Sequence, residues 1–594
     1  MAITTVAPKT KLTGGSFLLE DHNLDNVFTP EDFNGDQQMI AKLAEEFAIN
    51  EILPNVEKIE HKEWQVSRDL LRKAAEMGLT NADVPAEFGG SEMDKISSAI
   101  IADRMAKCGS FVVSMGAHAG IGTLPLVFFG TEEQKKKYLP KLAAAEMIGA
   151  YALSESTSGS DALNSRTRAV LSPDGEHYIL NGEKMWITNA HFADLFTIVA
   201  KVDGEKFTAF LVEKDFAGFS VGAEEKKMGI RGSSTAPLIL NDCKVPVENV
   251  LGEIGKGHII AFNILNIGRF KLGAGCVGGA RASLQNAIAY AQERKAFGKV
   301  IADFGLIREK LAQMAVGIFA NEAMVYRTVG MMENAMPEGE KSSEVIRKAI
   351  EEYAVECSII KVAGSEMLDF VVDETVQVYG GYGFVEEYAA ERAYRDSRVN
   401  RIFEGTNEIN RMIITGWLLK RAMSGQLPLL PAIKKTMDEV MAAPSFEELE
   451  GAMAAEQKIA GNAKKLSMLV AGAASQKYMQ KLADQQEVMG AIADMVIETF
   501  AMDSCVLRAR KFLEANGEQK SALVTAMTQV YIAGAMNRLE ASAKKIIAAV
   551  AEGDMLRTQM AIVRRLVKFE PTNVIALQEQ IAARVLETGK YVTV

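Results

Sequence analysis

The feature that most constrains the fold of this chain is a block of β-type sequence, from residue 151 to residue 258, that separates two long helical stretches. Inside the block, short apolar runs such as Phe207–Val212 alternate with Ser172-Pro-Asp-Gly175 and Asn181-Gly182, which favour hairpin turns. Before and after the block, apolar residues recur at helical spacing. The sequence therefore predicts a mainly α fold with a central β domain, either a small barrel or a sandwich.

The same changes of pattern divide the chain into segments. Residues 1–34 are mixed and turn-prone, and we expect them to form an extended arm. We then expect an N-terminal helical domain over 35–150, a β-barrel domain over 151–258 and a helical bundle over 259–422. After a linker that contains Gly and Pro, residues 432–594 are predicted to form a C-terminal helical extension.

The extension repeats part of the preceding bundle. Leu311–Met314, Phe319 and Arg327 match Ile492–Met495, Phe500 and Arg508 at a constant offset of 181 residues. We interpret the extension as a possible degenerate copy of the bundle. Because it contains no second Glu-Gly-Thr triplet, a copy would have a structural role.

Composition narrows the class of protein. The net charge of −11 argues against nucleic acid as a partner, because there is no basic surplus to neutralise phosphates. Five cysteines are scattered singly, which is typical of a reduced cytosol and predicts no metal site. The N-terminus lacks the apolar core of a signal peptide, and we expect no apolar run to approach the ~20 residues that a spanning helix needs. We predict a cytoplasmic protein.

Three motifs carry a family resemblance: Arg401-Ile-Phe-Glu-Gly-Thr-Asn-Glu-Ile409, Gln377-Val-Tyr-Gly-Gly-Tyr-Gly-Phe384 and Lys184-Met-Trp-Ile-Thr-Asn189. Together they resemble the acyl-CoA dehydrogenases, from about residue 35 to residue 594, and most closely the long-chain and very-long-chain branch with its extra C-terminal helices. The resemblance implies FAD-dependent oxidation of a fatty acyl-CoA to the trans-2-enoyl-CoA, the first step of β-oxidation. It also implies electron-transfer flavoprotein as electron acceptor and a homodimer or larger homo-oligomer.

The resemblance assigns the catalytic base to Glu404. Some family members place the base just before an arginine on the first helix of the third domain, and Gly268, which precedes Arg269, cannot take protons. Arg269 and its neighbour Asn266 correspond to substrate contacts, as do Ser160 and Gly405. In the family, the base's backbone N–H and a ribityl hydroxyl of FAD hold the thioester oxygen.

The resemblance also implies an FAD site drawn from distant segments. Thr188 corresponds to the donor to flavin N5, with Trp186 against the ring, and Arg294 to the residue that binds the pyrophosphate of a neighbouring subunit's FAD. One departure is Ser156, where the family has proline. The complete set of expected FAD contacts is Tyr151, Leu153, Ser154, Ser160, Trp186, Ile187, Thr188, Arg294, Phe297, Gln377, Gly380, Gly381, Thr406 and Glu408.

Several alternatives stay open at this point. An acyl-CoA oxidase would use the same base and fold but reoxidise with oxygen, and a catalytically silent scaffold would keep the fold alone. The segment 454–480 mixes lysines with apolar residues, so it could touch a membrane or simply pack on its own domain. Small residues at Gly116, Gly120 and nearby could leave a deep acyl channel or only allow close packing.

Overall fold

A computed structural model describes residues 12–337, 339, 342–442 and 451–594. The first helical region starts with a capping box, in which Asn34 and Gln37 satisfy each other's backbone N–H groups at the start of α1. Thr131 and Gln134 form the same kind of capping box at α7, and the Asp94 side chain caps α4 by accepting from the backbone N–H of Ser97. The helices are α1 (Gly35–Phe47), α2 (Val56–Glu60), α3 (Trp64–Glu76), α4 (Lys95–Arg104), α5 (Gly109–Gly116), α6 (Leu124–Phe129) and α7 (Glu132–Ala143).

One apolar stretch of the chain is longer than the sequence pattern predicted. Gly109–Phe129, which includes α5 and α6 and a π-helical segment between them, is 21 residues long with a mean hydropathy of 1.6, enough by length and composition to cross a membrane. The expectation that no such run exists is therefore wrong. In the structure, 67% of this apolar window is buried, as in the core helix of a folded domain. Its apolar character is accounted for by contacts with β1 and α8.

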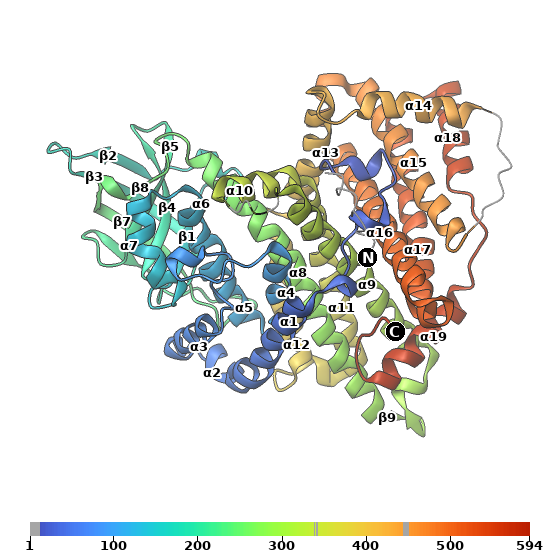
Figure 1. Ribbon diagram of the computed structural model, residues 1–594, viewed down its shortest axis with the longest axis horizontal. Helices are drawn as coiled ribbons and strands as arrows, with labels where there is room; N and C mark the ends of the chain where they lie inside the picture. The colour runs from blue at the N-terminus through green and yellow to red at the C-terminus, as the bar shows by residue number, and fades with distance from the viewer. Residues whose placement is uncertain (1–11, 338, 340–341, 443–450) are drawn as a thin grey trace, which may run out of the picture.

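The central region is a sheet of eight strands (Figure 1), in the order β6-β7-β3-β2-β4-β5-β8, with β1 pairing parallel to β4. Its long strand β3 is irregular, because its register against β7 shifts between Lys184 and Ile187. This is where the Lys-Met-Trp-Ile-Thr motif lies. The strands are β1 (Gly149–Ala152), β2 (Arg168–Leu171), β3 (His177–Thr188), β4 (Leu195–Val202), β5 (Lys206–Glu213), β6 (Phe219–Val221), β7 (Thr235–Pro246) and β8 (Val250–Leu251).

Helices return at Gly257, and the predicted mainly α fold with a central β domain is confirmed. The long helices α8 and α11 pack side by side at the centre of the molecule (Figure 1), and α9 and α13 cover them. A short hairpin of β9 (Lys295–Ala296) and β10 (Lys299–Val300) follows α8. The helices are α8 (Gly257–Glu293), α9 (Gly305–Ala335), α10 (Ser343–Glu352), α11 (Ala354–Tyr379), α12 (Ala389–Ser397) and α13 (Asn407–Met423).

The regular elements in the described part of the C-terminal extension are all helices, and the extension packs on the bundle through α16 against α9 and α13. Its helices form the orange and red half of Figure 1, and α19 returns to lie beside α9. They are α14 (Leu429–Met441), α15 (Ala454–Tyr478), α16 (Gln486–Asn516), α17 (Glu518–Val550), α18 (Gly553–Leu566) and α19 (Val574–Thr588).

The contact between α9 and α16 is reciprocal. Arg327 lies over the ring of Phe500 at 4.8 Å, and Arg508 lies over the ring of Phe319 at 4.6 Å. These are the residues that the offset of 181 pairs in the sequence, so each helix offers its partner the same arginine and the same aromatic ring. A two-fold contact between like helices has this pattern. It supports the interpretation of the extension as a copy, which stays a prediction.

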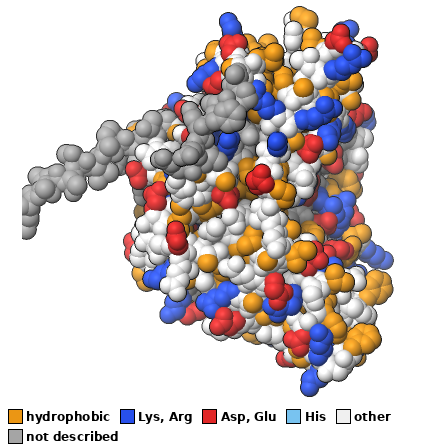
Figure 2. Space-filling model, turned by 90° about the vertical axis from the view of Figure 1, so that its right-hand side faces the viewer, with side chains coloured by type: hydrophobic (Ala, Val, Ile, Leu, Met, Phe, Trp, Pro, Cys, Tyr) orange, Lys and Arg blue, Asp and Glu red, His pale blue; other side chains and the backbone are white. Residues whose placement is uncertain are grey.

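The segment 454–480, weighed above as a membrane contact, corresponds to α15, whose apolar residues point into the domain. Leu466, Met468 and Val470 are buried, and Lys464 is buried in an ion pair with Asp503 at 2.9 Å. On the face of the molecule that the extension presents, Lys and Arg side chains are interspersed with Asp and Glu (Figure 2). This favours the simpler interpretation, a helix that packs on its own domain.

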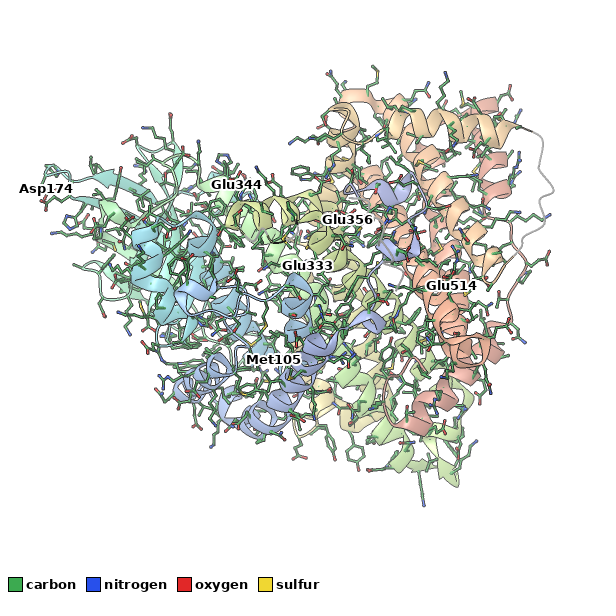
Figure 3. The ribbon with its side chains drawn as sticks, viewed as in Figure 1. Met105, Asp174, Glu333, Glu344, Glu356 and Glu514 are labelled. Carbon is green, nitrogen blue, oxygen red and sulfur yellow. The ribbon has the colours of Figure 1, made fainter. Side chains whose placement is uncertain are left out.

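Residues 12–34 hold the two helical regions together. The backbone N–H of Gly15 donates to Glu356 of α11 at 2.7 Å, near the centre of the molecule (Figure 3), while Phe17 packs on Phe500 of α16 at 4.6 Å. Further along, Glu31 pairs with Arg508 at 2.7 Å. Phe17 and Leu18 are buried in the main hydrophobic core. The N-terminal segment is therefore part of the core between bundle and extension.

Candidate active site

Glu404 and Gly405 form a sharp turn just before α13, and both have left-handed backbone angles, with φ of 57° and 79°. Only glycine adopts this region without cost, so Glu404 is held there by its surroundings. Lys361 of α11 donates to the Gly405 carbonyl at 2.8 Å, and Asn410 of α13 donates to the same carbonyl at 2.8 Å. Arg269 of α8 donates to the Glu404 carbonyl at 3.3 Å. Three helices thus fix the turn.

The side chain of Glu404 faces an internal cavity. Its Oε2 atom is buried and has no hydrogen-bond partner among the described residues. Burial raises the pKa of Glu404 to about 7, although Arg269 and Lys361 act in the opposite direction. A carboxylate with this pKa, free of hydrogen bonds at one oxygen, can take up a proton near neutral pH.

Gly268 lies directly opposite Glu404. A Cβ atom added at Gly268 would lie 2.2 Å from Oε2 of Glu404, far inside van der Waals contact. The two positions at which the family resemblance places a base therefore face the same point in space, and only one of them can hold a side chain. Glycine at 268 leaves that point to Glu404.

The cavity is a channel of about 270 Å³ that follows one face of α8. From residue 268 to residue 286, this face extends about 27 Å at 1.5 Å per residue. Small residues keep the channel open on this side, and the opposite wall comes from α4, α5 and α12. The residues of α8 that line it are Gly268, Lys271, Leu272, Gly275, Cys276, Gly279, Ala282, Ser283 and Asn286.

The expected substrate contacts do not all lie in the same place in the structure. Gly405 is part of the turn and Arg269 supports it, with Asn266 accepting a hydrogen bond from Arg269 at 2.8 Å. Arg269 and Asn266 are both buried. Ser160 is exposed, in the loop between β1 and β2.

On the β-sheet side, Thr188 at the end of β3 lines the same channel. Trp186 has a positive φ of 59°, and its side chain is 56% exposed. Three other expected FAD contacts, Tyr151, Leu153 and Ile187, are buried. An exposed indole beside an open channel offers a flat apolar surface for a planar ligand.

A buried ion pair holds this region in place, and sequence reasoning missed it. Lys184 donates to Glu155 at 2.7 Å and to the carbonyl of Leu153 at 3.2 Å. Glu155 in turn accepts hydrogen bonds from the backbone N–H groups of Arg166 and Thr167. The pair therefore clamps the loop that follows β1 onto the irregular part of β3. Lys184 lies in one of the quoted motifs, but its pairing with Glu155 is a tertiary contact without a sequence signature.

Three of the remaining expected FAD contacts line a second cavity, of about 390 Å³, next to the β9–β10 hairpin. Arg294, Gly380 and Gly381 line it, and the guanidinium of Arg294 lies 5.5 Å from the ring centre of Tyr382. Phe297, at the tip of the hairpin, is 95% exposed. Gln377 is at the end of α11, and Thr406 and Glu408 begin α13. A single chain thus places the expected contacts in two separate groups.

One other group of potential ligands lies far from both cavities. Asp174, Glu176 and His177 place their ligand atoms within 4.8 Å of one another at the tip of the β2–β3 hairpin, where Figure 3 labels Asp174. Asp174 and Glu176 are exposed. Exposed acidic groups of this kind are common, and this group is not part of the site.

Comparisons with known proteins agree along the whole chain. Models of the acyl-CoA dehydrogenase N-terminal, middle and C-terminal domains match residues 34–146, 150–243 and 255–419, and a second model of an acyl-CoA dehydrogenase C-terminal domain matches 462–565. A probable acyl-CoA dehydrogenase of Bacillus subtilis (strain 168) is 50% identical over 582 residues, covering 97% of this chain and 98% of the relative. A very long-chain specific mitochondrial acyl-CoA dehydrogenase of Rattus norvegicus is 35% identical over 477 residues, covering 76% and 71%. The crystal structure of a Bacillus anthracis acyl-CoA dehydrogenase complexed with FAD is 51% identical, covers 98% of this chain and 100% of that one, and has a TM-score of 0.96.

Proposed function

The chain belongs to the acyl-CoA dehydrogenase family, and we propose that it oxidises long-chain fatty acyl-CoA to trans-2-enoyl-CoA with Glu404 as the base and FAD as the cofactor. One observation carries the proposal. Glu404 places a carboxylate with a pKa of about 7 on the wall of a long channel, and one oxygen of this carboxylate has no hydrogen-bond partner in the described part of the chain. A thioester bound with its acyl chain in the channel would present its α-carbon to this oxygen.

Glu404 would remove the α-proton. Because a thioester α-carbon is a weak acid, the negative charge that develops on the thioester oxygen needs hydrogen-bond donors. The backbone N–H of Glu404 is one candidate, since the left-handed turn at residues 404–405 is held rigid by Arg269, Lys361 and Asn410. Each such donor is commonly worth roughly 3 kcal/mol in the transition state.

The residues around Thr188 and Arg294 fit FAD. The half-exposed indole of Trp186 suits the flat face of a flavin, and the cavity beside Arg294 has space for phosphates, because Cβ atoms added at Gly380 and Gly381 would meet no atom within 4 Å. Bound FAD would supply the acceptor for the β-hydride. We propose that Tyr151, Thr188 and their neighbours hold the flavin end of one FAD, while Arg294 and Phe297 reach the FAD of a second subunit.

The length of the channel supports a long acyl chain. Its ~27 Å exceeds the ~15 Å that one lipid tail occupies in half of a bilayer's hydrocarbon core. Gly116 and Gly120 border the channel, and a Cβ added at either would meet no atom within 4 Å. Larger side chains there would project into open space and shorten the channel.

We further propose that the enzyme acts as a homodimer or larger homo-oligomer in the cytoplasm and passes its electrons to electron-transfer flavoprotein. The exposed Phe297 and the separation of the FAD contacts into two groups support a second subunit. The acceptor is inferred from the family. Rapid oxygen consumption with peroxide release during turnover would instead point to an oxidase.

The proposal is tested by anaerobic titration of the purified protein with acyl-CoAs from butanoyl-CoA to octadecanoyl-CoA, following the visible flavin band. We expect bleaching to be most complete with the longer chains. Gly116→Leu should shift this preference toward shorter chains while bleaching by a short-chain substrate persists. If no acyl-CoA bleaches the flavin, the proposed function is wrong, and if Gly116→Leu leaves the preference unchanged, the assignment of the channel is wrong.

A further inference from the structure

The end of the channel furthest from Glu404 carries several polar and charged residues, which is unexpected for a site that would receive the methyl end of a fatty acid. Near Glu404, the lining combines apolar residues such as Ile121 and Phe403 with Lys271, which is already paired with Asp83 at 2.6 Å. Toward the other end, small or apolar residues alternate with the polar residues Lys107, Ser283, Asn286, Arg392, Asp396 and Ser397. Because polar groups lose their hydration when an alkyl chain covers them, this end would bind a hydrocarbon poorly.

The position of Arg392 follows from the packing of α11 and α12 on α8. The hydroxyl of Tyr379, at the end of α11, donates to the Asn286 carbonyl at 3.3 Å, and the ring of Tyr379 lies 6.2 Å from that of Tyr388. Tyr388 directly precedes α12, so α12 starts at the level of Asn286. The chain then runs back along the channel through Asn400 and Phe403 to Glu404. Arg392, one turn into α12, therefore lies near the far end.

The Arg392 guanidinium is weakly engaged by the rest of the protein. Among the described residues, it makes one ion pair, at 3.8 Å to Glu57, whose side chain is 80% exposed. Arg395, on the same helix, instead has two hydrogen bonds to Glu391, at 2.6 and 2.9 Å. Arginine prefers such bidentate pairing with a carboxylate, so Arg392 has donors available for an anion inside the channel.

The nearby charges do not satisfy Arg392. Lys107 adds a second cation at this end, although it is paired with Glu45 at 3.2 Å. Asp396 also lines the channel, and its carboxylate accepts a hydrogen bond from the backbone N–H of Ile230. Burial raises the pKa of Asp396 to about 7, with the Ile230 hydrogen bond acting against it, so a large part of this group is uncharged at neutral pH.

We propose that Arg392 binds the terminal carboxylate of a long ω-carboxyacyl-CoA, whose thioester end lies at Glu404. This rests on the proposed dehydrogenase function and deepens it by naming a second substrate class for the same channel. The length agrees. From Gly268 to Ser283, which lies at the level of Arg392, α8 rises about 22 Å at 1.5 Å per residue. An extended chain advances roughly 1.3 Å for each carbon–carbon bond of about 1.5 Å, so this span corresponds to roughly 17 bonds.

The experiment compares kcat/KM for three substrates of equal length: hexadecanoyl-CoA, ω-hydroxyhexadecanoyl-CoA and hexadecanedioyl-CoA. The wild type should use the dicarboxylic substrate at least as well as the ω-hydroxy one. Arg392→Gln should lower kcat/KM for hexadecanedioyl-CoA by roughly 10- to 100-fold, the loss expected for a hydrogen-bonded charge. It should change the value for hexadecanoyl-CoA by less than about twofold. Arg392→Lys should recover part of the loss.

Arg398→Gln is the matched control, because it removes the same charge from the helical turn that follows α12, where Arg398 is exposed and outside the channel lining. It should leave all three values unchanged. Equal losses on all three substrates in Arg392→Gln, or no loss on any, would overturn the inference. If the wild type bleaches with none of the three, the proposed function fails instead. If the wild type oxidises hexadecanoyl-CoA but not hexadecanedioyl-CoA, only the ω-carboxylate inference fails.

Discussion

The catalytic bundle and its junction with the extension bury carboxylates in opposite ways. Glu404 has one oxygen without a hydrogen-bond partner among the described residues, and burial raises its pKa to about 7. Asp503 of α16 is also buried, but Arg327 and Lys464 pair with it at 2.8 and 2.9 Å. Burial alone would raise the pKa of Asp503, and these two cations more than offset it and hold the pKa below its usual value. The first arrangement suits the base proposed above, and the second is a structural ion-pair cluster.

Asp503 also has a counterpart in the bundle. At the offset of 181 it corresponds to Glu322 of α9, which pairs with Arg508 at 2.8 Å, just as Asp503 pairs with Arg327. We propose that the extension is a degenerate internal copy that has kept this reciprocal pairing and has no counterpart of the Glu404 turn. On this interpretation, one ancestral helical unit now serves as catalyst in one copy and as support in the other.

The sharpest way to break the comparison is to neutralise the carboxylate of the base. Glu404→Gln keeps the shape of the side chain and removes its proton affinity, so the rate of flavin reduction by a long-chain acyl-CoA should fall by about 10²–10⁴-fold. Stopped-flow absorbance measures this rate. The visible spectrum of bound flavin should be retained. A loss smaller than tenfold would show that another group removes the proton.

The opposite change at the junction should affect stability and not chemistry. Asp503→Asn leaves Arg327 and Lys464 buried without their shared anion, which should lower the free energy of unfolding by about 3–5 kcal/mol. Calorimetry on the holoprotein gives the shift in melting temperature. Asp554→Asn, in an ion pair that is almost fully exposed, is the control and should change little. If flavin reduction in Asp503→Asn slows as much as in Glu404→Gln, the two kinds of carboxylate are not separate in function.

Placement of the base is tested at Gly268. Because an added Cβ would lie 2.2 Å from Oε2 of Glu404, Gly268→Ala should push the Glu404 carboxylate out of its present position. A misplacement of about 1 Å can cost roughly 10²-fold in rate. Gly461→Ala on α15, where the added methyl meets no atom within 4 Å, controls for the general effect of replacing a helical glycine. An unchanged rate in Gly268→Ala would mean that catalysis does not depend on the exact position of the Glu404 carboxylate.

The smallest effect expected is on pH dependence. Glu404 must be ionised to accept a proton, so kcat/KM should fall about tenfold per pH unit below its pKa of about 7. The effect of pH on the stability of the fold has the opposite sign to its effect on kcat/KM. Since the folded-state pKa lies above the ordinary glutamate value of 4.5, the group stabilises the fold below pH 4.5, and this contribution is lost as pH rises through 7. The melting temperatures of wild type and Glu404→Gln should therefore move apart as pH rises from 4.5 to 7, and the variant should have the higher value above neutrality.

Much of the fold could be predicted because its signals are local. The change from helical to β-type spacing at Tyr151 and back near His258 is a property of neighbouring residues, and it gave the mainly α fold with a central β domain. The length of the apolar stretch at Gly109–Phe129 was not predicted, because glycines and serines interrupt its apolar residues. Its average hydropathy nevertheless stays high enough for a membrane-spanning helix. Its burial depends on partners such as α8, which the stretch itself does not encode.

Residues of the candidate site could be predicted where they lie in one of the family motifs. Glu404 and Gly268 were found from the motifs, and the structure adds that they face each other. Asn410 and Lys361, which hold the turn, and Glu155, which pairs with Lys184, were missed. Their roles arise from contacts between elements far apart in the chain. Arg392 was not predicted for the same reason, because the sequence around it is that of an ordinary charged helix.

The buried N-terminal segment has a consequence for how the chain is made. Asp21 pairs with Lys464 and Glu31 with Arg508, partners 443 and 477 residues further along the chain. A ribosome adding about 5–20 residues per second needs roughly half a minute to a minute and a half to produce them. Throughout that interval Phe17 and the α9 surface around Phe319 lack their final cover. Residues 12–34 are thus synthesised well before the segments that cover them, and their final packing waits until α15 and α16 have been translated.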